Sequence, residues 1–460
     1  YEQNPSYFRK RKSDLTRRLI DSLFLVDLKE SHYNDYQAAY YKCHQEWAAV
    51  KILLGKKARH TAVYLAEKLL AKAQEYEFIE ICQSISRVLR YHYATRQKDI
   101  AQFEYYNGLF KEYKERQAAE QEAEEAYLTV ALMDVNPDIK AKKNDNAETD
   151  RSKEKRISAA AKMLYEELED VLKKYDTHNL HLYGYLLQSV IYDVVNNYKE
   201  MIGVCKEAIH FFEQKPFESH IPLQVFYYQQ LVCYTQLQQY EEGEAIAKKC
   251  LGVLEEGGFN WFKYYETYFI LCLYTGRYAE AQRIFLEATT HVRFSTLPDH
   301  VGEMWKLYEA YLHYLIRVGK LELQEVNGKK LRTFKLGKFI NETLNMAKNK
   351  RGENIAILNI QICFYLADEN YDSVTERMEA LSAYRFRYLN QDSNYRSNCF
   401  LKMLLLIPEG NYYKQRVQLR VKRYLRKLKK NPLGSANQAH QIEIIPYEDL
   451  WEMILDTLKG

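Results

Sequence analysis

Hydrophobic positions recur at helical spacing along most of this 460-residue chain. Near the amino terminus, Leu15, Leu19 and Leu23 follow one another at intervals that place them on one face of a helix. Proline, which long helices exclude, does not occur between positions 5 and 137. The pattern predicts two amphipathic helices over 14–54, a helical hairpin over 58–96 and a long helix over about 98–132.

A charged stretch interrupts this pattern at 134–156. It contains Pro137, charges of both signs and almost no large apolar side chain. Such a segment buries too little apolar surface to offset the entropy of ordering it. We therefore expect a flexible linker or loop that separates an N-terminal helical region, 1–133, from the rest of the chain.

The clearest repetition follows this stretch, where tyrosines open a series of second helices. Tyr198, Tyr240 and Tyr278 stand at corresponding positions, and the stretch from Gly276 to Ala288 is the best preserved copy. A recurrence on this scale indicates stacked helical hairpins. The predicted first helices cover 182–194, 223–237 and 261–275, and their partners cover 198–213, 240–256 and 278–293.

The best copy resembles a tetratricopeptide repeat (TPR). Gly276-Arg277-Tyr278-Ala279-Glu280-Ala281, followed by Phe285 and Ala288, is similar to the second-helix signature of that family. The copies depart from it because their spacing exceeds the TPR period of about 34 residues. The middle of the first helix also carries larger residues than usual, such as Phe269. The resemblance implies an all-α fold, a right-handed α-solenoid of TPR-like helical hairpins with its repeat core at 157–318.

Two short alternating arms flank Asn327-Gly328 after the helix predicted over 301–318. Asn-Gly between such arms is typical of a β-hairpin with a type I′ turn. We expect a small β-hairpin insertion near 320–336, within a segment bounded at 319–337. A frayed loop is the alternative.

The remainder of the chain predicts further helical repeats over 338–430 and a C-terminal tail with a capping helix over 431–460. Ile442 to Ile445 form a possible short strand, and Pro446 is well placed to open a final helix through Leu458. Such a helix would shield the end of the array. The stretch from Ile444 to Trp451 is also similar to the ending of uncharacterised bacterial TPR proteins.

Tyrosine is the compositional outlier, with 41 tyrosines against 19 phenylalanines. Most are expected to fill seams between helices with the hydroxyl at the wet edge, and the alternative is an aromatic-lined recognition groove. TPR-like arrays present their first helices on a concave groove that receives a peptide or a partner helix. The resemblance places these candidate partner-binding residues in that groove: Tyr183, Asp193, Tyr228, Thr235, Gln236, Lys263, Glu266 and Tyr274.

Charge gathers at two places in a chain whose net charge is only +4. One is the stretch 9–18, and the other is 410–430, which holds nine basic residues and no acidic one. A solvated outer face, a docking surface for an acidic protein or anionic membrane, and a phosphate-binding surface are the three interpretations. The candidate basic patch consists of Lys414, Arg416, Arg420, Lys422, Arg423, Arg426 and Lys427.

Catalytic motifs with recognisable spacing do not occur. The chain has no phosphate-binding glycine loop, no nucleophile elbow and no metalloprotease helix. His178 and His181 could share a metal, but no third ligand follows a matching pattern. The eight cysteines are widely separated, which fits a reducing compartment. We expect no catalytic site, no cofactor and no metal.

These observations predict a non-catalytic scaffold or adaptor that binds a peptide or partner helix in the groove. The alternative is a regulatory or nucleic-acid-associated protein that uses its basic terminal patches, with nucleic acid the secondary expectation. No apolar run long enough for a membrane span occurs. We expect a cytoplasmic location, although a leader removed before Tyr1 would not be seen.

Overall fold

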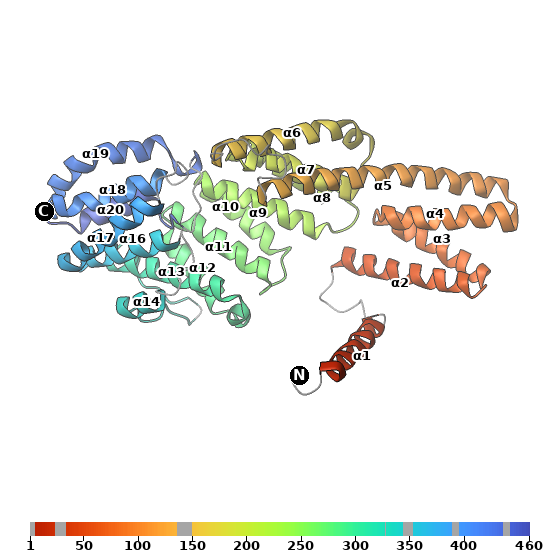
Figure 1. The fold of residues 1–460 in the computed structure, drawn as a ribbon, viewed down its shortest axis with the longest axis horizontal. Helices are drawn as coiled ribbons and strands as arrows, with labels where there is room; N and C mark the ends of the chain where they lie inside the picture. The colour runs from red at the N-terminus through yellow and green to blue at the C-terminus, as the bar shows by residue number, and fades with distance from the viewer. Residues whose placement is uncertain are drawn as a thin grey trace. The chain divides into compact units, whose positions relative to one another are not determined.

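The computed structural model describes residues 5–23, 34–135, 150–326, 328–343, 353–388, 395–435 and 442–460. Within these ranges every regular element is a helix (Figure 1). The chain forms two compact units. The first unit comprises Tyr1–Ile139, Ala160–Gln188 and Ala208–Pro222, and the second comprises Lys140–Ala159, Ser189–Glu207 and Leu223–Gly460.

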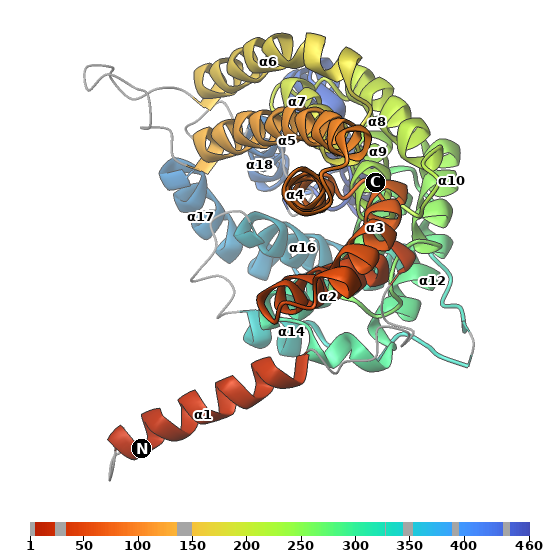
Figure 2. The ribbon, with the colours of Figure 1, turned by 90° about the vertical axis from the view of Figure 1, so that its right-hand side faces the viewer.

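Helices of the first unit follow the predicted order, although α1 begins at Pro5 rather than near residue 14. They are α1 (Pro5–Leu23), α2 (Asp35–Gly55), α3 (Arg59–Glu75), α4 (Ile79–His92), the short π-helix η1 (Tyr93–Gln97) and α5 (Ile100–Val135). Helices α4 and α5 lie side by side, as Figures 1 and 2 both show. The core holds small and branched side chains on the inner faces of α2, α3 and α4, among them Cys43, Val50, Ala66 and Ile85.

The amphipathic pattern of α1 does not lead to burial. Leu15, Leu19 and Leu23 are 58%, 57% and 62% exposed. The predicted helix is therefore present, and its apolar stripe is exposed.

Four helices contribute residues to both units. They are α6 (Asp150–Lys174), α7 (His178–Asp193), α8 (Tyr198–Glu213) and α9 (His220–Gln236). The start of α6 corrects the predicted linker at 134–156, because residues 150–156 are helical and α5 runs to Val135. The middle of that predicted linker, 136–149, lies outside the described residues.

Helix pairs continue through the second unit. They are α10 (Tyr240–Leu251), α11 (Phe259–Tyr274), α12 (Tyr278–Thr289), η3 (Val292–Thr296), α13 (Asp299–Arg317), α14 (Leu336–Thr343), α16 (Glu353–Ala367), α17 (Tyr371–Tyr388), α18 (Tyr395–Glu409), α19 (Lys414–Lys430), η5 (Leu433–Ser435) and α20 (Tyr447–Asp456). The recurring tyrosines Tyr198, Tyr240 and Tyr278 are the first residues of α8, α10 and α12, and Tyr371 begins α17 in the same way. Consecutive helices α10, α11 and α12 pack in that order.

One turn geometry recurs where a helix ends. A residue with positive φ follows the helix, and the next residue donates its N–H to a carbonyl five positions back, as Arg277 does to Cys272 at 2.8 Å and Gln239 to Tyr234 at 2.9 Å. This is the Schellman arrangement, which satisfies carbonyls that the helix end leaves free. It occurs at Lys57, Glu77, Asn196, Gln238, Gly276, Gly319 and Glu369.

Small residues allow paired helices to approach closely. Ala281 and Ala288 are fully buried in α12. At Gly243 in α10, an added Cβ would lie only 2.5 Å from Leu271 of α11. The small side chains of the repeat signature therefore match positions of tight packing.

Two predicted β elements do not form as strands. In the described part of 320–336, Val326 and Lys329 exchange backbone hydrogen bonds of 2.9 Å, and this isolated bridge is the only strand-like pairing there. Asn327, at the centre of the predicted turn, lies outside the described residues. Glu443 to Ile445 are buried and Ile442 is half-buried, but this stretch pairs with no strand among the described residues.

Candidate functional site

The last part of the chain, residues 442–460 (the C-terminal segment), packs against α11 and α18 of the second unit. The hydroxyl of Tyr274 in α11 donates a 2.7 Å hydrogen bond to the backbone oxygen of Glu443. Tyr447 stacks on Phe400 of α18, with ring centroids 4.2 Å apart. Residues from distant helices thus hold an extended stretch that continues into α20, which lies among α16 to α19 in Figure 1.

A buried arginine anchors this segment. Arg396, at the start of α18, is 1% exposed, and its guanidinium contacts Glu443 at 2.6 Å and Glu448 at 2.5 Å. It also donates to the backbone oxygens of Asn431 at 2.7 Å and Leu428 at 3.3 Å, so it joins the C-terminal segment to the end of α19. Fully satisfied networks of this kind specify one arrangement of their members.

Burial and pairing act in opposite directions on the ionisation of this cluster. Burial raises the pKa of Glu443, and Arg396 and the backbone N–H of Tyr447 lower it only in part. Burial alone would lower the pKa of Arg396, but its hydrogen bonds to Glu443 and Glu448 outweigh that effect and raise it. The arginine therefore stays charged, and it is the group that makes a carboxylate tolerable at this depth.

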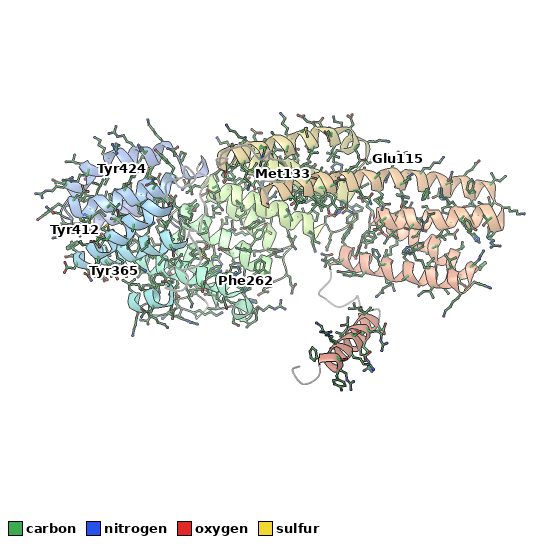
Figure 3. All side chains as sticks on the ribbon, viewed as in Figure 1. Glu115, Met133, Phe262, Tyr365, Tyr412 and Tyr424 are labelled. Carbon is green, nitrogen blue, oxygen red and sulfur yellow. The ribbon has the colours of Figure 1, made fainter. Side chains whose placement is uncertain are left out.

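The far end of the segment is tied to the start of α19. The backbone N–H of Lys414 donates to the oxygen of Lys459 at 2.8 Å, and the N–H of Lys459 donates to the oxygen of Tyr412 at 2.9 Å. Tyr412 is labelled in Figure 3. The Lys414 ammonium also pairs with Asp456 at 2.9 Å. With both ends fixed and its apolar side chains buried, the segment belongs to the core of this unit.

An open cavity of about 870 Å³ lies beside the C-terminal segment. Its wall includes the turn from Gln238 to Glu241, the turn from Tyr274 to Tyr278 and the stretch from Pro446 to Met453, together with Lys320, Arg396, Lys429, Pro432 and Leu433. The signature turn at Gly276 thus forms part of its wall. The space is large enough for a segment of another chain.

Charges of both signs face this cavity. Arg277, Lys320 and Lys429 are exposed basic residues on its wall, and Glu241 and Glu452 are exposed acidic ones. Some pair loosely: Arg277 lies 3.4 Å from Glu241, and Lys320 lies 4.0 Å from Asp456. Pairs this exposed contribute little to stability, so the charges stay available to a bound molecule.

The acidic side of the cavity carries a perturbed carboxyl. Burial raises the pKa of Asp449, and the neighbouring Glu448 and Glu452 raise it further. Acidic side chains at the start of α20 interact favourably with the helix dipole, but they repel one another. A positively charged group on a partner would relieve that repulsion.

Half of the predicted groove residues are buried, which corrects the expectation that they face outward. Thr235, Gln236, Glu266 and Tyr274 are 3%, 9%, 4% and 2% exposed. Tyr274 is covered by the C-terminal segment through Glu443. Glu266 of α11 faces α13, where it accepts a 2.8 Å hydrogen bond from Tyr308.

The other four predicted groove residues are more accessible. Tyr228 and Lys263 are half-buried, and Asp193 is exposed. Tyr183 belongs to the first unit, where its hydroxyl donates to Glu124 at 3.0 Å. None of the four lines the cavity beside the C-terminal segment.

Six of the seven predicted basic-patch residues are exposed on α19, and Lys414 is half-buried. Helix α19 turns Val417, Val421 and Leu428 inward, as its apolar stripe predicts. Tyr424, labelled in Figure 3, marks this helix, from which long side chains project into solvent. The patch is therefore a continuous helical face.

The histidine pair serves the packing of the first unit. His178 stacks on Tyr36 with centroids 5.0 Å apart, and its backbone N–H donates to Glu77 at 2.7 Å. Lys215, 6% exposed at its side chain, pairs with the same Glu77 at 2.8 Å. His181 lies against Phe211, with centroids 4.2 Å apart. In the part of the chain that the structure describes, no group of three metal-ligating side chains gathers.

The buried thiols and one buried carboxyl also have raised pKa values. All eight cysteines are buried and free, and burial raises the pKa of Cys43 to about 11 and of Cys82 to about 12. Burial also raises the pKa of Glu120 in α5 to about 7, against the lowering effect of the nearby polar side chains of Thr177 and Asn179. Thiols with raised pKa values are poor nucleophiles at neutral pH.

Sequence reasoning missed the anchor of this site. Arg396, Glu443 and Glu448 carried no local signal, because an arginine at the start of a helix and glutamates near the end of a chain are ordinary. The one usable sign was Glu443 itself, a charged residue within the apolar run Ile442–Ile445. Such a residue needs a buried partner of opposite charge.

Comparison with protein-family models, with curated proteins and with solved structures found no match. Among the described helices, none combines the length and apolar character needed to cross a bilayer. The proposals below therefore depend on the residues and geometry of this chain.

Proposed function

We propose that this chain is a non-catalytic scaffold, a right-handed solenoid of TPR-like helical hairpins that binds a peptide or helix of a partner protein. The recurring Schellman turns and the close approach at Gly243 support the repeat architecture. Arrays of this kind extend by nearest-neighbour packing and expose long surfaces for partners.

The observation that carries the proposal is the cavity beside the C-terminal segment. It is open, about 870 Å³ in volume, and lined by two helix-end turns that carry tyrosines and charges. Tyr240, Tyr278 and Arg277 offer amphipathic surface and hydrogen-bonding groups suited to an extended or helical segment. We assign the partner to this cavity.

The C-terminal segment itself is not an exchangeable ligand in this proposal. Ile444, Ile445, Tyr447, Trp451 and Ile454 are each no more than 1% exposed. Fully burying one such side chain contributes about 1.5–3 kcal/mol, so releasing all five would expose far more apolar surface than a partner contact of ordinary size restores. The segment covers Tyr274 of α11, so a partner can reach the open cavity but not the surface beneath the segment.

Site-specific photo-cross-linking tests the location. A photoreactive residue replaces Glu241, which is exposed on the cavity wall, and in a matched control it replaces Glu207, which is exposed on α8. Partners captured from the native cells should cross-link from position 241 and not from position 207. The Arg277→Glu variant should lose that cross-link. Equal cross-linking from both positions, or none from 241, contradicts the proposal.

A further inference from the structure

Helix α19 presents a basic surface that the scaffold proposal does not use. We define the α19 basic face as the exposed residues Arg416, Arg420, Lys422, Arg423, Arg426, Lys427 and Lys430. They cover the part of the helix surface that the fully buried Val417 and Leu428 leave exposed. The helix has 17 residues and so extends about 25 Å at 1.5 Å per residue.

Few carboxylates neutralise this face. Arg420 lies 3.4 Å from Glu409, with both side chains about half exposed. No other residue of the face forms an ion pair with a carboxylate that the structure describes. Lys402 of the neighbouring α18 adds a further positive charge, 5.9 Å from the Tyr424 ring. The surface therefore has a strong positive field along its whole length.

The same face offers little apolar surface. Leu419, 76% exposed, is the one large apolar side chain that projects from the outer side of α19 among the described residues. Interfaces with folded proteins need a desolvated core of aromatic or aliphatic anchors, and helices that lie in a membrane need an apolar face to insert. A partner that supplies regularly spaced negative charge and needs no apolar anchor fits this face best.

We propose that the α19 basic face binds the phosphate backbone of a nucleic acid without reading its sequence. Four of its seven side chains are arginines, whose planar guanidinium groups suit phosphate oxygens. Spacing between basic residues along about 25 Å of helix spans several consecutive phosphates. This activity is independent of the cavity, so either can fail without the other.

Salt-dependent binding tests the proposal directly. The full chain is titrated into fluorescein-labelled mixed-sequence duplex DNA, single-stranded DNA and RNA, each about 25 nucleotides long, from about 50 to 300 mM salt. Fluorescence anisotropy should show binding at low salt that weakens steeply. For duplex DNA the slope of log K against log salt should be about −0.9 for each phosphate neutralised. Absence of binding to all three probes at the lowest salt overturns the proposal.

A matched pair of variants separates this face from net charge. Arg416, Arg423 and Arg426→Gln removes three charges from it, whereas Lys199, Lys206 and Lys249→Gln removes three exposed charges from α8 and α10. The first variant should reduce the salt slope on duplex DNA by about 2.7, and the second should leave it nearly unchanged. An equal loss in both variants overturns the proposal.

Two further probes distinguish other polyanions. Polyglutamate represents an acidic polypeptide, and phosphatidylserine–phosphatidylcholine vesicles represent an anionic membrane. We expect the nucleic acids to bind at least about tenfold more tightly than polyglutamate at equal salt. Tighter binding to polyglutamate or to the vesicles than to every nucleic acid would identify a different partner and reject this one.

Discussion

Replacing Arg396 by methionine should destabilise the second unit more than the replacement of any exposed charged residue. The substitution keeps most of the apolar length but leaves Glu443, which is fully enclosed, without its guanidinium partner. Leaving one member of a buried ion pair unpaired costs about 3–5 kcal/mol. The backbone oxygens of Leu428 and Asn431 also lose a donor, which adds about 1 kcal/mol each where water does not replace it.

Urea denaturation and hydrogen exchange measure this effect. Arg396→Met should lower the free energy of unfolding by about 3–7 kcal/mol, and the amides of α20 should exchange about a hundredfold faster or more, since each 1.4 kcal/mol is a factor of ten. The exposed Arg420, which lies 3.4 Å from Glu409, is the control. Arg420→Met should cost less than about 1 kcal/mol.

A double substitution tests the physical reason for the loss. Arg396→Met combined with Glu443→Leu removes both buried charges, and such exchanges are often neutral or stabilising. The double variant should therefore recover most of the stability that the single variant loses. A single variant within about 1 kcal/mol of the wild type, with unchanged exchange in α20, would refute the assignment of Arg396 as the anchor.

Two other substitutions test the packing and ionisation of the helices. Glu120→Gln should gain stability over the wild type as pH rises. Folding raises the pKa of Glu120 from 4.5 to about 7, so between these pH values the folded wild type holds a proton that the unfolded chain has released. The stabilisation from this proton is present below pH 4.5 and is lost as the pH rises through 7. The relative gain should reach roughly 2–3 kcal/mol by pH 8 in paired thermal unfolding curves, and a constant difference between pH 4.5 and 8 would contradict the raised pKa. Gly243→Leu should cost about 1–3 kcal/mol, because its Cβ alone would lie 2.5 Å from Leu271 and three more carbon atoms follow it, whereas a neutral effect on the urea midpoint would mean that α10 and α11 are not closely packed.

Local patterns in the sequence predicted the helices well. Tyr198, Tyr240 and Tyr278 stand at the first residue of their helices, as the repeat interpretation required. Apolar periodicity placed most other helices within a few residues, because it reports which side chains a helix can bury together. Spacing alone does not report burial, because Leu15 and its neighbours in α1 form the predicted helix but remain exposed.

The turns show why the repeat was only partly visible. Glycine marks the left-handed position at Gly276 and Gly319, but Lys57, Glu77 and Gln238 adopt it too. The backbone hydrogen bond that closes each turn offsets the strain of a side chain at positive φ, so the residue type gives no warning. The structure therefore reveals more copies of the turn than the sequence does.

The candidate site depends on contacts that no local pattern contains. Tyr274 and Glu443 are 169 positions apart, yet their hydrogen bond helps hold the C-terminal segment against α11. Helix register alone predicts that Tyr274 and Glu266 are exposed to solvent. Both are buried, because register does not show that distant parts of the chain cover them. The cavity could be found only after the segment that bounds it was in place.

The most direct test of the scaffold proposal is the dissociation constant of a partner captured through the cavity, measured for two charge reversals. Arg277→Glu changes the cavity wall, and Lys199→Glu changes an equally exposed residue on α8. The proposal predicts that Arg277→Glu weakens binding at least about tenfold, which corresponds to about 1.4 kcal/mol, and that Lys199→Glu leaves it unchanged. Equal affinities for both variants and the wild type would contradict it.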